Sequence, residues 1–119
     1  MRVQDLILQK LRESHFTEKV IFGVRLSLEE ALVNAIKHGN GLDRSKNVHV
    51  RFTVNQDHLL VEIEDEGPGF RPEDVPDPTA PENLERPCGR GLLLMRSYMT
   101  ECQFLAPGNI CRMRRVREE

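Results

Sequence analysis

The sequence predicts a two-layer α+β domain in which helices cover one face of a mixed, mostly antiparallel sheet. The chain has 119 residues, of which 39% are hydrophobic and 30% charged, and these values are typical of one globular domain. Apolar residues recur at a helical period in some segments and at a strand period in others. Segments of the same kind come in clusters without strict alternation, which favours an antiparallel-rich sheet with helices on one face. We therefore expect residues 1–119 to form a single domain.

Two helices are predicted before the first strand. Residues 2–13 carry apolar side chains at helical spacing, so they are expected to form an amphipathic helix. Thr17 is a plausible N-cap for a second helix, whose apolar stripe runs from Val20 to Ile36. A glycine-rich turn at residues 39–41 ends this second helix.

A hairpin is predicted next, because residues 48–54 and 59–63 alternate between apolar and polar side chains. A third helix is expected over residues 91–99. Two last strands are expected over residues 103–106 and 110–116, on either side of a Pro-Gly-Asn turn.

Residues 66–88, between the hairpin and the third helix, have a different composition. They contain six of the seven prolines and no clear periodicity, so they are expected to form a long loop. Loops of this length inside a compact domain are usually functional lids or disordered segments.

Composition argues against several classes of protein. The net charge is −2, with no Trp and one Tyr, so neither a basic field nor a set of stacking aromatics supports nucleic-acid binding. No apolar run is long enough to span a membrane. The three cysteines form no CxxC pair, so the sequence indicates neither a disulfide framework nor a zinc site. We expect a cytoplasmic protein with reduced thiols.

Three polar residues follow one another at steps of four in the second predicted helix. Glu30, Asn34 and His38 each lie about 40° further round an α-helix than the one before, so they form one slanting stripe. This stripe is either a solvated helix face or a set of groups aimed at one ligand. In the second interpretation, the Asn34 amide oxygen suits Mg²⁺, which keeps most of its waters, and the Glu30 carboxylate suits a general base.

An acidic residue also interrupts the apolar face of the hairpin. Period two puts Asp65 on the same face of the predicted strand as the apolar side chains of residues 59–63. A carboxylate on that apolar face needs hydrogen-bond donors. It either caps the turn that follows or accepts a hydrogen bond from a buried donor, such as the exocyclic amine of adenine. Gly67 and Gly69 would let the backbone approach such a ligand closely.

A glycine-rich segment, Cys88-Gly89-Arg90-Gly91-Leu92, is expected to be a turn that opens into the third helix. Free amides and the dipole at a helix N-terminus favour phosphate, and Arg90 adds a cation with planar donors. Alone this pattern is common and weak. Together with the polar stripe and with Asp65, it predicts an ATP site, with the proline-rich loop as its lid.

These three segments resemble those of a known family. EALVNAIKHG is similar to the N box of the GHKL ATPases, which have the Bergerat fold, DEGPGF to their G1 box, and GRGLLLMRSYMTE to their G2 box. Within this family, the sequences of the three motifs are more similar to those of the anti-sigma-factor serine kinases of bacteria. The resemblance covers residues 18–115, and it implies a histidine kinase-like ATPase fold. Family members usually carry a strand before the first helix, whereas this chain begins almost at that helix.

The resemblance implies a role for each matching position. Glu30 matches the general base that activates water or a serine hydroxyl, Asn34 the Mg²⁺ ligand, and Asp65 the adenine-binding aspartate. Glu29 is a second candidate for the base, but it lies about 100° from Glu30 and off the stripe. The other implied nucleotide-binding positions are Lys37 and His38 near the phosphates, Gly67, Gly69 and Phe70 in the base-contacting turn, and Gly89, Arg90, Gly91 and Leu92 at the phosphates. Residues 71–88 would form the ATP lid.

The resemblance further implies a protein serine/threonine kinase that uses ATP and Mg²⁺. Such a kinase would phosphorylate an anti-anti-sigma protein of the STAS type and sequester a sigma factor, and the family commonly dimerises. The main alternative is a nucleotide-gated binding module with little or no kinase activity. A fragment of a sensor histidine kinase is disfavoured, because the chain has no room for a phosphoacceptor helix pair.

Overall fold

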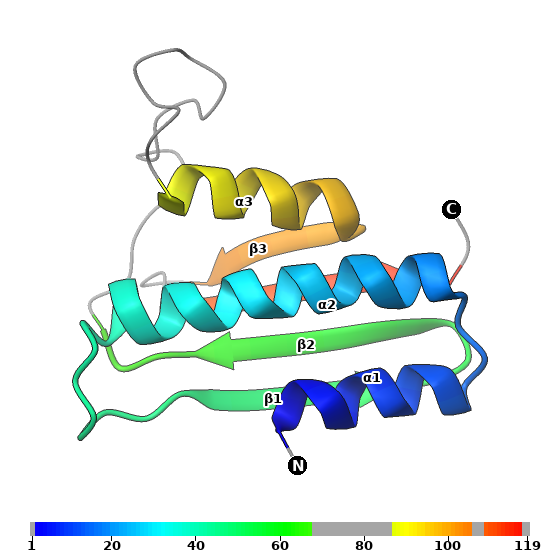
Figure 1. The fold of residues 1–119 in the computed structure, drawn as a ribbon, viewed down its shortest axis with the longest axis horizontal. Coiled ribbons are helices and arrows are strands. Elements are labelled where there is room, and N and C mark those ends of the chain that lie inside the picture. Colours follow the sequence, from blue (N-terminus) through cyan, green and yellow to red (C-terminus); the bar gives the residue numbers. More distant parts are fainter. Residues whose placement is uncertain (1, 68–86, 106–108, 118–119) are drawn as a thin grey trace.

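The fold is a two-layer arrangement of helices on a sheet, seen in a computed structural model that describes residues 2–67, 87–105 and 109–117 (Figure 1). In chain order the elements are α1 (Val3–Glu13), α2 (Glu18–Val33), the π-helix η1 (Asn34–Gly39), β1 (His49–Val54), β2 (His58–Glu64), α3 (Pro87–Tyr98), β3 (Glu101–Leu105) and β4 (Ile110–Val116). None of the described helices is long and apolar enough to cross a membrane.

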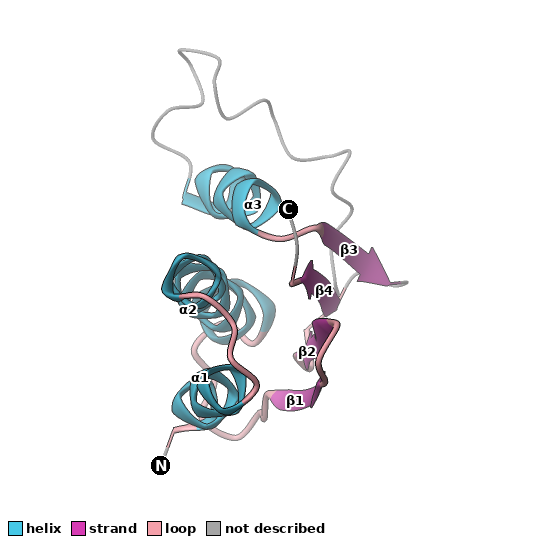
Figure 2. Ribbon diagram, turned by 90° about the vertical axis from the view of Figure 1, so that its right-hand side faces the viewer, coloured by secondary structure: helices cyan, strands magenta, loops and turns pink. Residues whose placement is uncertain are grey.

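The described strands form one four-stranded sheet in the order β1-β2-β4-β3, and each neighbouring pair is antiparallel. The helices lie on one face of it: α1 over the β1 side, α3 over the β3 side, and α2 between them (Figure 2). The predicted fold class, helices on one face of a mostly antiparallel sheet, is therefore confirmed.

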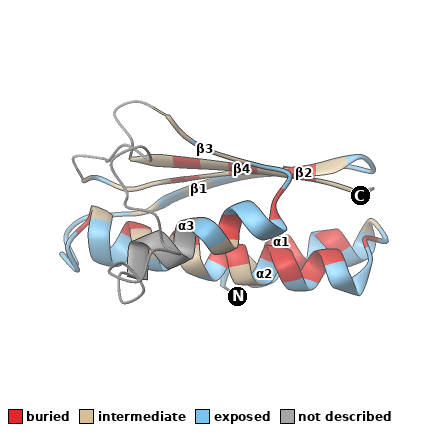
Figure 3. Ribbon diagram, turned by 90° about the horizontal axis from the view of Figure 1, so that it is seen from above, coloured by how far each residue is buried: buried red, intermediate tan, exposed pale blue. Residues whose placement is uncertain are grey.

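The hydrophobic core fills the space between these two layers, as the banding of buried residues in Figure 3 shows. In β2, Leu59, Val61 and Ile63 alternate with less buried residues, and each is at most 1% exposed. The helices contribute the facing residues, among them Ile7 and Leu28. Burying each such side chain contributes about 1.5–3 kcal/mol. The period-two pattern that predicted this strand is thus the pattern of its burial.

The start of α2 matches the sequence prediction, but its end does not. Thr17 is the N-cap, and its hydroxyl accepts a hydrogen bond from the Val20 amide at 3.3 Å. The expected unbroken α-helix changes at Asn34 into η1, where the Asn40 amide donates to the Ala35 carbonyl at 2.8 Å. The predicted stripe of Glu30, Asn34 and His38 depends on 3.6 residues per turn. That α-helical geometry ends at Asn34, before His38 is reached. Single π-turns of this kind are frequent at functional sites.

The third helix begins earlier than the glycine pattern predicted. It starts at Pro87, a residue well suited to a first helical turn, rather than at Gly91. Pro87 and Cys88 therefore belong to α3 and not to the loop, and residues 89–91 are helical rather than a turn. The strand that follows also starts two residues early, at Glu101.

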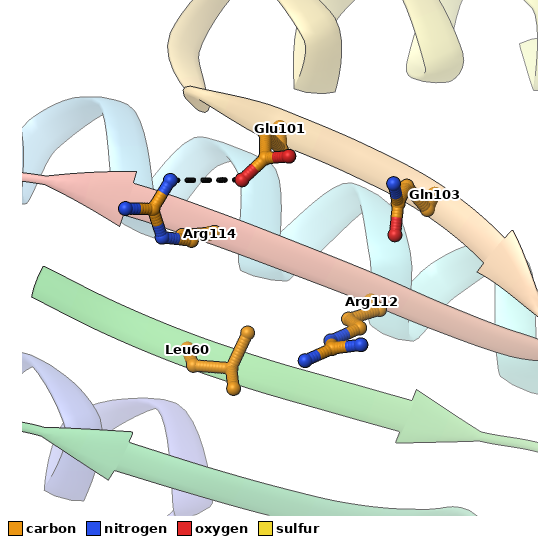
Figure 4. Close-up of a pocket in the computed structure, with 5 residues that line it drawn as sticks. All are labelled: Leu60, Glu101, Gln103, Arg112 and Arg114. Atoms are coloured by element: carbon orange, nitrogen blue, oxygen red, sulfur yellow. Dashed lines mark hydrogen bonds and ion pairs between the residues drawn. The ribbon is translucent and has the colours of Figure 1, made fainter.

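The face of the sheet away from the helices is polar. Arg51 lies 3.2 Å from Glu62 and 3.1 Å from Glu64, and Arg114 lies 2.8 Å from Glu101. A depression of about 150 Å³ on this face is lined by Leu60, Glu101, Gln103, Arg112 and Arg114 (Figure 4). None of the residues predicted to bind nucleotide lines this depression. Such exposed ion pairs contribute little stability, about 0–1 kcal/mol each.

Arg117, just after β4, joins two distant turns. Its guanidinium donates to the carbonyls of Ser14 and His15 in the α1–α2 turn and of Gln56 in the β1–β2 turn. It also lies over the Phe16 ring, 4.1 Å from the centroid. His15 has a φ of 63°, so this side chain holds a turn with a left-handed residue.

We expect Arg117→Ala to lower the free energy of unfolding by about 2–3 kcal/mol, because charge-assisted hydrogen bonds and a cation–π contact are lost together. Arg114→Ala is the matched control, because it removes an exposed ion pair worth about 0–1 kcal/mol. Urea unfolding followed by circular dichroism measures both. Equal losses in the two variants would contradict a stabilising role for the contacts of Arg117 with the two turns.

Candidate functional site

The candidate site lies where η1 and β2 end. The ends of η1 and β2 and the start of α3 share one end of the molecule (Figure 1). A Cβ atom added to Gly39 would lie 2.2 Å from the Asp65 carboxylate, and one added to Gly67 would lie 2.1 Å from the Gly39 carbonyl oxygen. The two predicted boxes are therefore packed backbone against backbone, with no space for a side chain at either glycine.

Asp65 is half-buried at this junction. Its Oδ1 atom accepts a hydrogen bond from the Gly67 amide at 2.7 Å. Burial raises the pKa of the Asp65 carboxyl above its ordinary value, the Gly67 hydrogen bond opposes this, and the charge of Glu64 adds to it. Among the described residues no Lys, Arg or His forms an ion pair with this carboxylate. A carboxylate held in this way is an acceptor ready for a hydrogen-bond donor of a ligand.

Two asparagines fix the backbone on either side of this carboxylate. Asn109 accepts from the Asp65 amide at 3.0 Å and donates from Nδ2 to the Asp65 carbonyl at 2.9 Å. Asn40 is 5% exposed; its Oδ1 accepts from the Glu66 amide at 2.7 Å and its Nδ2 donates to the Asn47 carbonyl at 3.1 Å. The buried Oδ1 of Asn109 accepts no hydrogen bond from the part of the chain that the structure describes. From the sequence, both asparagines are expected only in turns.

The predicted base and metal ligand stand on the helix that leads into this junction. Glu30 and Asn34 are partly buried, whereas Glu29, Lys37 and His38 are exposed. The partial burial of Glu30 agrees with its position on the flank of the core-facing stripe. η1, which contains Asn34, Lys37 and His38, ends at Gly39 and so connects this polar stripe directly to Asp65.

The remaining predicted positions are described only in part. Gly69, Phe70 and the lid residues 71–86 lie outside the described residues. Gly89, Arg90, Gly91 and Leu92 lie in the first turns of α3, and their side chains also lie outside the description. The first amides of an α-helix have no partner within the helix, and Pro87 has no N–H. The donors that α3 leaves for phosphate oxygens are therefore those at its start, around Cys88 and Gly89, whereas Gly91 and Leu92 lie beyond the first turn.

The oxygen atoms at this end of α2 suit Mg²⁺, which keeps most of its waters, better than a metal ion bound only by protein side chains. Within residues 2–67, 87–105 and 109–117, no cluster of three or more His, Cys, Asp or Glu side chains could hold a metal ion. Mg²⁺ keeps several waters and takes only one or two protein oxygens beside phosphate oxygens. The Asn34 amide oxygen and the Glu30 carboxylate, one turn earlier, are oxygen ligands of the type and number that Mg²⁺ takes from a protein.

We expect Gly39→Ala to weaken ATP binding at least about tenfold, a loss of about 1.4 kcal/mol. The new methyl group would displace the Asp65 carboxylate, which lies 2.2 Å from its position. Gly41→Ala is the matched control: Gly41 has a φ of +62° with open space around it, so its cost of about 1–2 kcal/mol falls on stability. Titration calorimetry and thermal unfolding of both variants separate the two effects. Equal ATP affinities in the two variants would contradict the close packing.

Comparison with known proteins shows the family of this chain. The model of the histidine kinase-like ATPase domain matches residues 2–115, so the chain belongs to this family. The family resemblance seen in the three boxes is thereby confirmed.

Within this family the chain is similar to kinases and anti-sigma factors. It is 27% identical over 95 residues to the serine-protein kinase RsbW of Oceanobacillus iheyensis, an alignment that covers 75% of this chain and 60% of that kinase. It is 30% identical over 89 residues to the anti-sigma F factor of Clostridium perfringens, with coverages of 72% and 63%. It is 30% identical over 92 residues to RsbW of Bacillus subtilis, with coverages of 72% and 58%. The chain thus spans less than two thirds of the length of these curated relatives.

Proposed function

We propose that this chain is an ATP-dependent protein serine/threonine kinase and anti-sigma factor. It would phosphorylate an anti-anti-sigma protein of the STAS type and sequester a sigma factor. The names of its relatives, serine-protein kinase and anti-sigma F factor, support this proposal. A protein that acts on a sigma factor works in the cytoplasm, and a homodimer is part of the proposal.

The observation that carries the proposal is the contact of Gly39 with Asp65 and Gly67. It brings the end of the helix with the predicted base and metal ligand against the carboxylate predicted to accept the adenine amine. A ligand held by both must present a base at one end and phosphates near the other, and ATP does so. The first turn of α3 supplies amides at the same end of the fold.

In this site each group has a distinct role in phosphoryl transfer. Asp65 accepts a hydrogen bond from the adenine amine and fixes the nucleotide. The Asn34 amide oxygen would hold Mg²⁺, which would supply positive charge against the phosphates. Glu30 takes the proton of the substrate hydroxyl as its oxygen forms a bond to the γ-phosphorus and the bond to the ADP oxygen breaks. Positioning and charge neutralisation are most of what this reaction requires.

Incubation with γ-labelled ATP, Mg²⁺ and a purified STAS-domain protein of the same organism tests the proposal. We expect label on a serine or threonine of the STAS protein, and none when Mg²⁺ is chelated. ATP binding without transfer to any STAS protein would instead favour the nucleotide-gated binding module. Sedimentation of the chain with and without ATP tests the homodimer.

A further inference from the structure

Two cysteines of the described chain lie together under α3, away from the nucleotide site. Cys102 on β3 and Cys111 on β4 are both free. The register pairs Cys102 with Met113 and Phe104 with Cys111, so the two cysteines are diagonal neighbours on adjacent strands. Both face the helices, because Cys111 belongs to the core and Cys102 packs against it. The two thiols are therefore brought together by strand pairing.

The two thiols differ in exposure and in contact. Cys111 is 7% exposed, whereas Cys102 is only partly buried and can be reached from solvent. The two thiols are close enough that each shifts the pKa of the other. Arg96 on α3 adds a positive charge near Cys102.

These surroundings favour the thiolate at one position only. The hydrogen bond from Cys111, followed by the charge of Arg96, lowers the pKa of Cys102, while burial opposes both. The pKa of Cys111 is raised, first by its hydrogen bond to Cys102, then by burial and by the Cys102 charge. A partly exposed thiolate beside a second thiol is the usual arrangement of a redox-sensitive cysteine.

We propose that Cys102 is a site of oxidation by peroxides and that Cys111 is its resolving thiol. The Cys102 thiolate attacks one peroxide oxygen, the O–O bond breaks, and the other oxygen leaves as water after taking a proton. Cys102 then carries a sulfenic acid and has no negative charge. Cys111 attacks the Cys102 sulfur, an S–S bond forms, and the hydroxyl group leaves as water with the Cys111 proton. One hydrogen peroxide thus oxidises two thiols and yields two waters.

The first step prepares the second. Once Cys102 is a neutral sulfenic acid, its negative charge no longer disfavours the Cys111 thiolate, although burial still does. Transient disulfides with a sensing role are the usual kind in a reducing compartment.

The disulfide would also act on the nucleotide site, a consequence that rests on the proposed ATP binding. Diagonal partners have Cα atoms about 7–8 Å apart. A disulfide requires about 4.4–6.8 Å, so oxidation draws the strands together here. Cys111 lies two residues after Asn109. Asn109 accepts a hydrogen bond from the Asp65 amide and donates one to the Asp65 carbonyl. We expect the oxidised protein to bind ATP about threefold to tenfold more weakly, which corresponds to about 0.7–1.4 kcal/mol.

Peptide mass spectrometry tests the oxidation directly. Both cysteines fall in one tryptic peptide, residues 97–112, because no Lys or Arg lies between Arg96 and Arg112. After hydrogen peroxide treatment and alkylation of the full chain, this peptide should take no alkyl group and be about 2 Da lighter than the unmodified reduced peptide. Two results would overturn the proposal. One is alkylation of both thiols at peroxide concentrations that oxidise the cysteines of redox-sensing proteins. The other is a disulfide to Cys88.

Single variants separate the roles of the thiols. Cys88→Ser should form the same disulfide as wild type. Cys111→Ser should stop at a Cys102 sulfenic acid that dimedone traps, and Cys102→Ser should leave Cys111 reduced. The wild-type peptide carries the test even if a core variant fails to fold. ATP titration of the reduced and oxidised wild type then tests the coupling, and equal affinities would overturn the coupling alone.

Discussion

A Glu30→Gln protein should bind ATP with Mg²⁺ about as well as wild type and transfer phosphate at least about 100-fold more slowly. The substitution keeps the size and the polar oxygen of the side chain but removes the group that takes the substrate proton. Glu30 is partly buried on the flank of α2, one turn before Asn34. Single-turnover transfer to a STAS protein, with ATP affinity measured in parallel, gives both numbers.

The neighbouring carboxylate supplies the matched control. Glu29 is exposed and lies about 100° round the helix from Glu30, so Glu29→Gln should keep transfer within about twofold of wild type. Loss of transfer in Glu29→Gln with normal transfer in Glu30→Gln would assign the base to the other residue. Normal transfer in both would remove the general base from this helix.

The second large effect is expected at Asn40, which no motif singled out. Asn40→Ala should lower the free energy of unfolding by about 2–4 kcal/mol, because the Glu66 amide and the Asn47 carbonyl both lose their partner. It should also weaken ATP binding at least about tenfold, because the Glu66 amide belongs to the strand end that carries Asp65. Chemical unfolding and calorimetry measure the two effects.

Asn55→Ala is the control for this variant. Asn55 also accepts two backbone hydrogen bonds, from Asp57 at 2.8 Å and from His58 at 2.9 Å, but it is exposed in the β1–β2 turn. Its loss should cost about 1 kcal/mol of stability and leave ATP affinity unchanged. An Asn40→Ala protein that behaves like Asn55→Ala would show that Asn40 does not support the site.

The elements that local pattern determines could be predicted from the sequence. Thr17 caps α2 because a hydroxyl before a helical run satisfies a free amide, and this signal lies within four residues. The hairpin strands follow from alternation, because one face of the sheet is buried and the other is not. The sequence motifs predicted Asp65 and Gly67 as site residues, and the structure packs both against Gly39.

What the sequence did not reveal depends on contacts between distant residues. Asn40 and Glu66 are 26 positions apart, and Asn109 and Asp65 are 44 apart, so neither pair leaves a periodic signal. The π-helix that begins at Asn34 ends at Gly39, which packs against Asp65 and Gly67 just after β2, and the sequence shows no break in helical spacing there. The glycines at 89 and 91 predict a turn, whereas α3 already begins at Pro87, a favoured first residue of a helix.

Asp65 allows stability and binding to be separated in one variant. Because burial raises the pKa of this carboxyl, the folded state takes up its proton more readily than the unfolded chain. Its ionisation therefore opposes folding, and the stability contribution falls as the pH rises from the ordinary carboxyl pKa through the raised one. Asparagine removes that charge and keeps an oxygen for the Gly67 amide. At neutral pH, Asp65→Asn should unfold at the same temperature as wild type or a higher one.

Calorimetric titration of wild type and Asp65→Asn with ATP in the presence of Mg²⁺ tests the central claim most directly. We expect saturable binding of one nucleotide by the wild type and no measurable binding by an Asp65→Asn protein that is fully folded. Equal affinity of the two proteins, or no ATP binding by folded wild type, would contradict the nucleotide site and the kinase built on it.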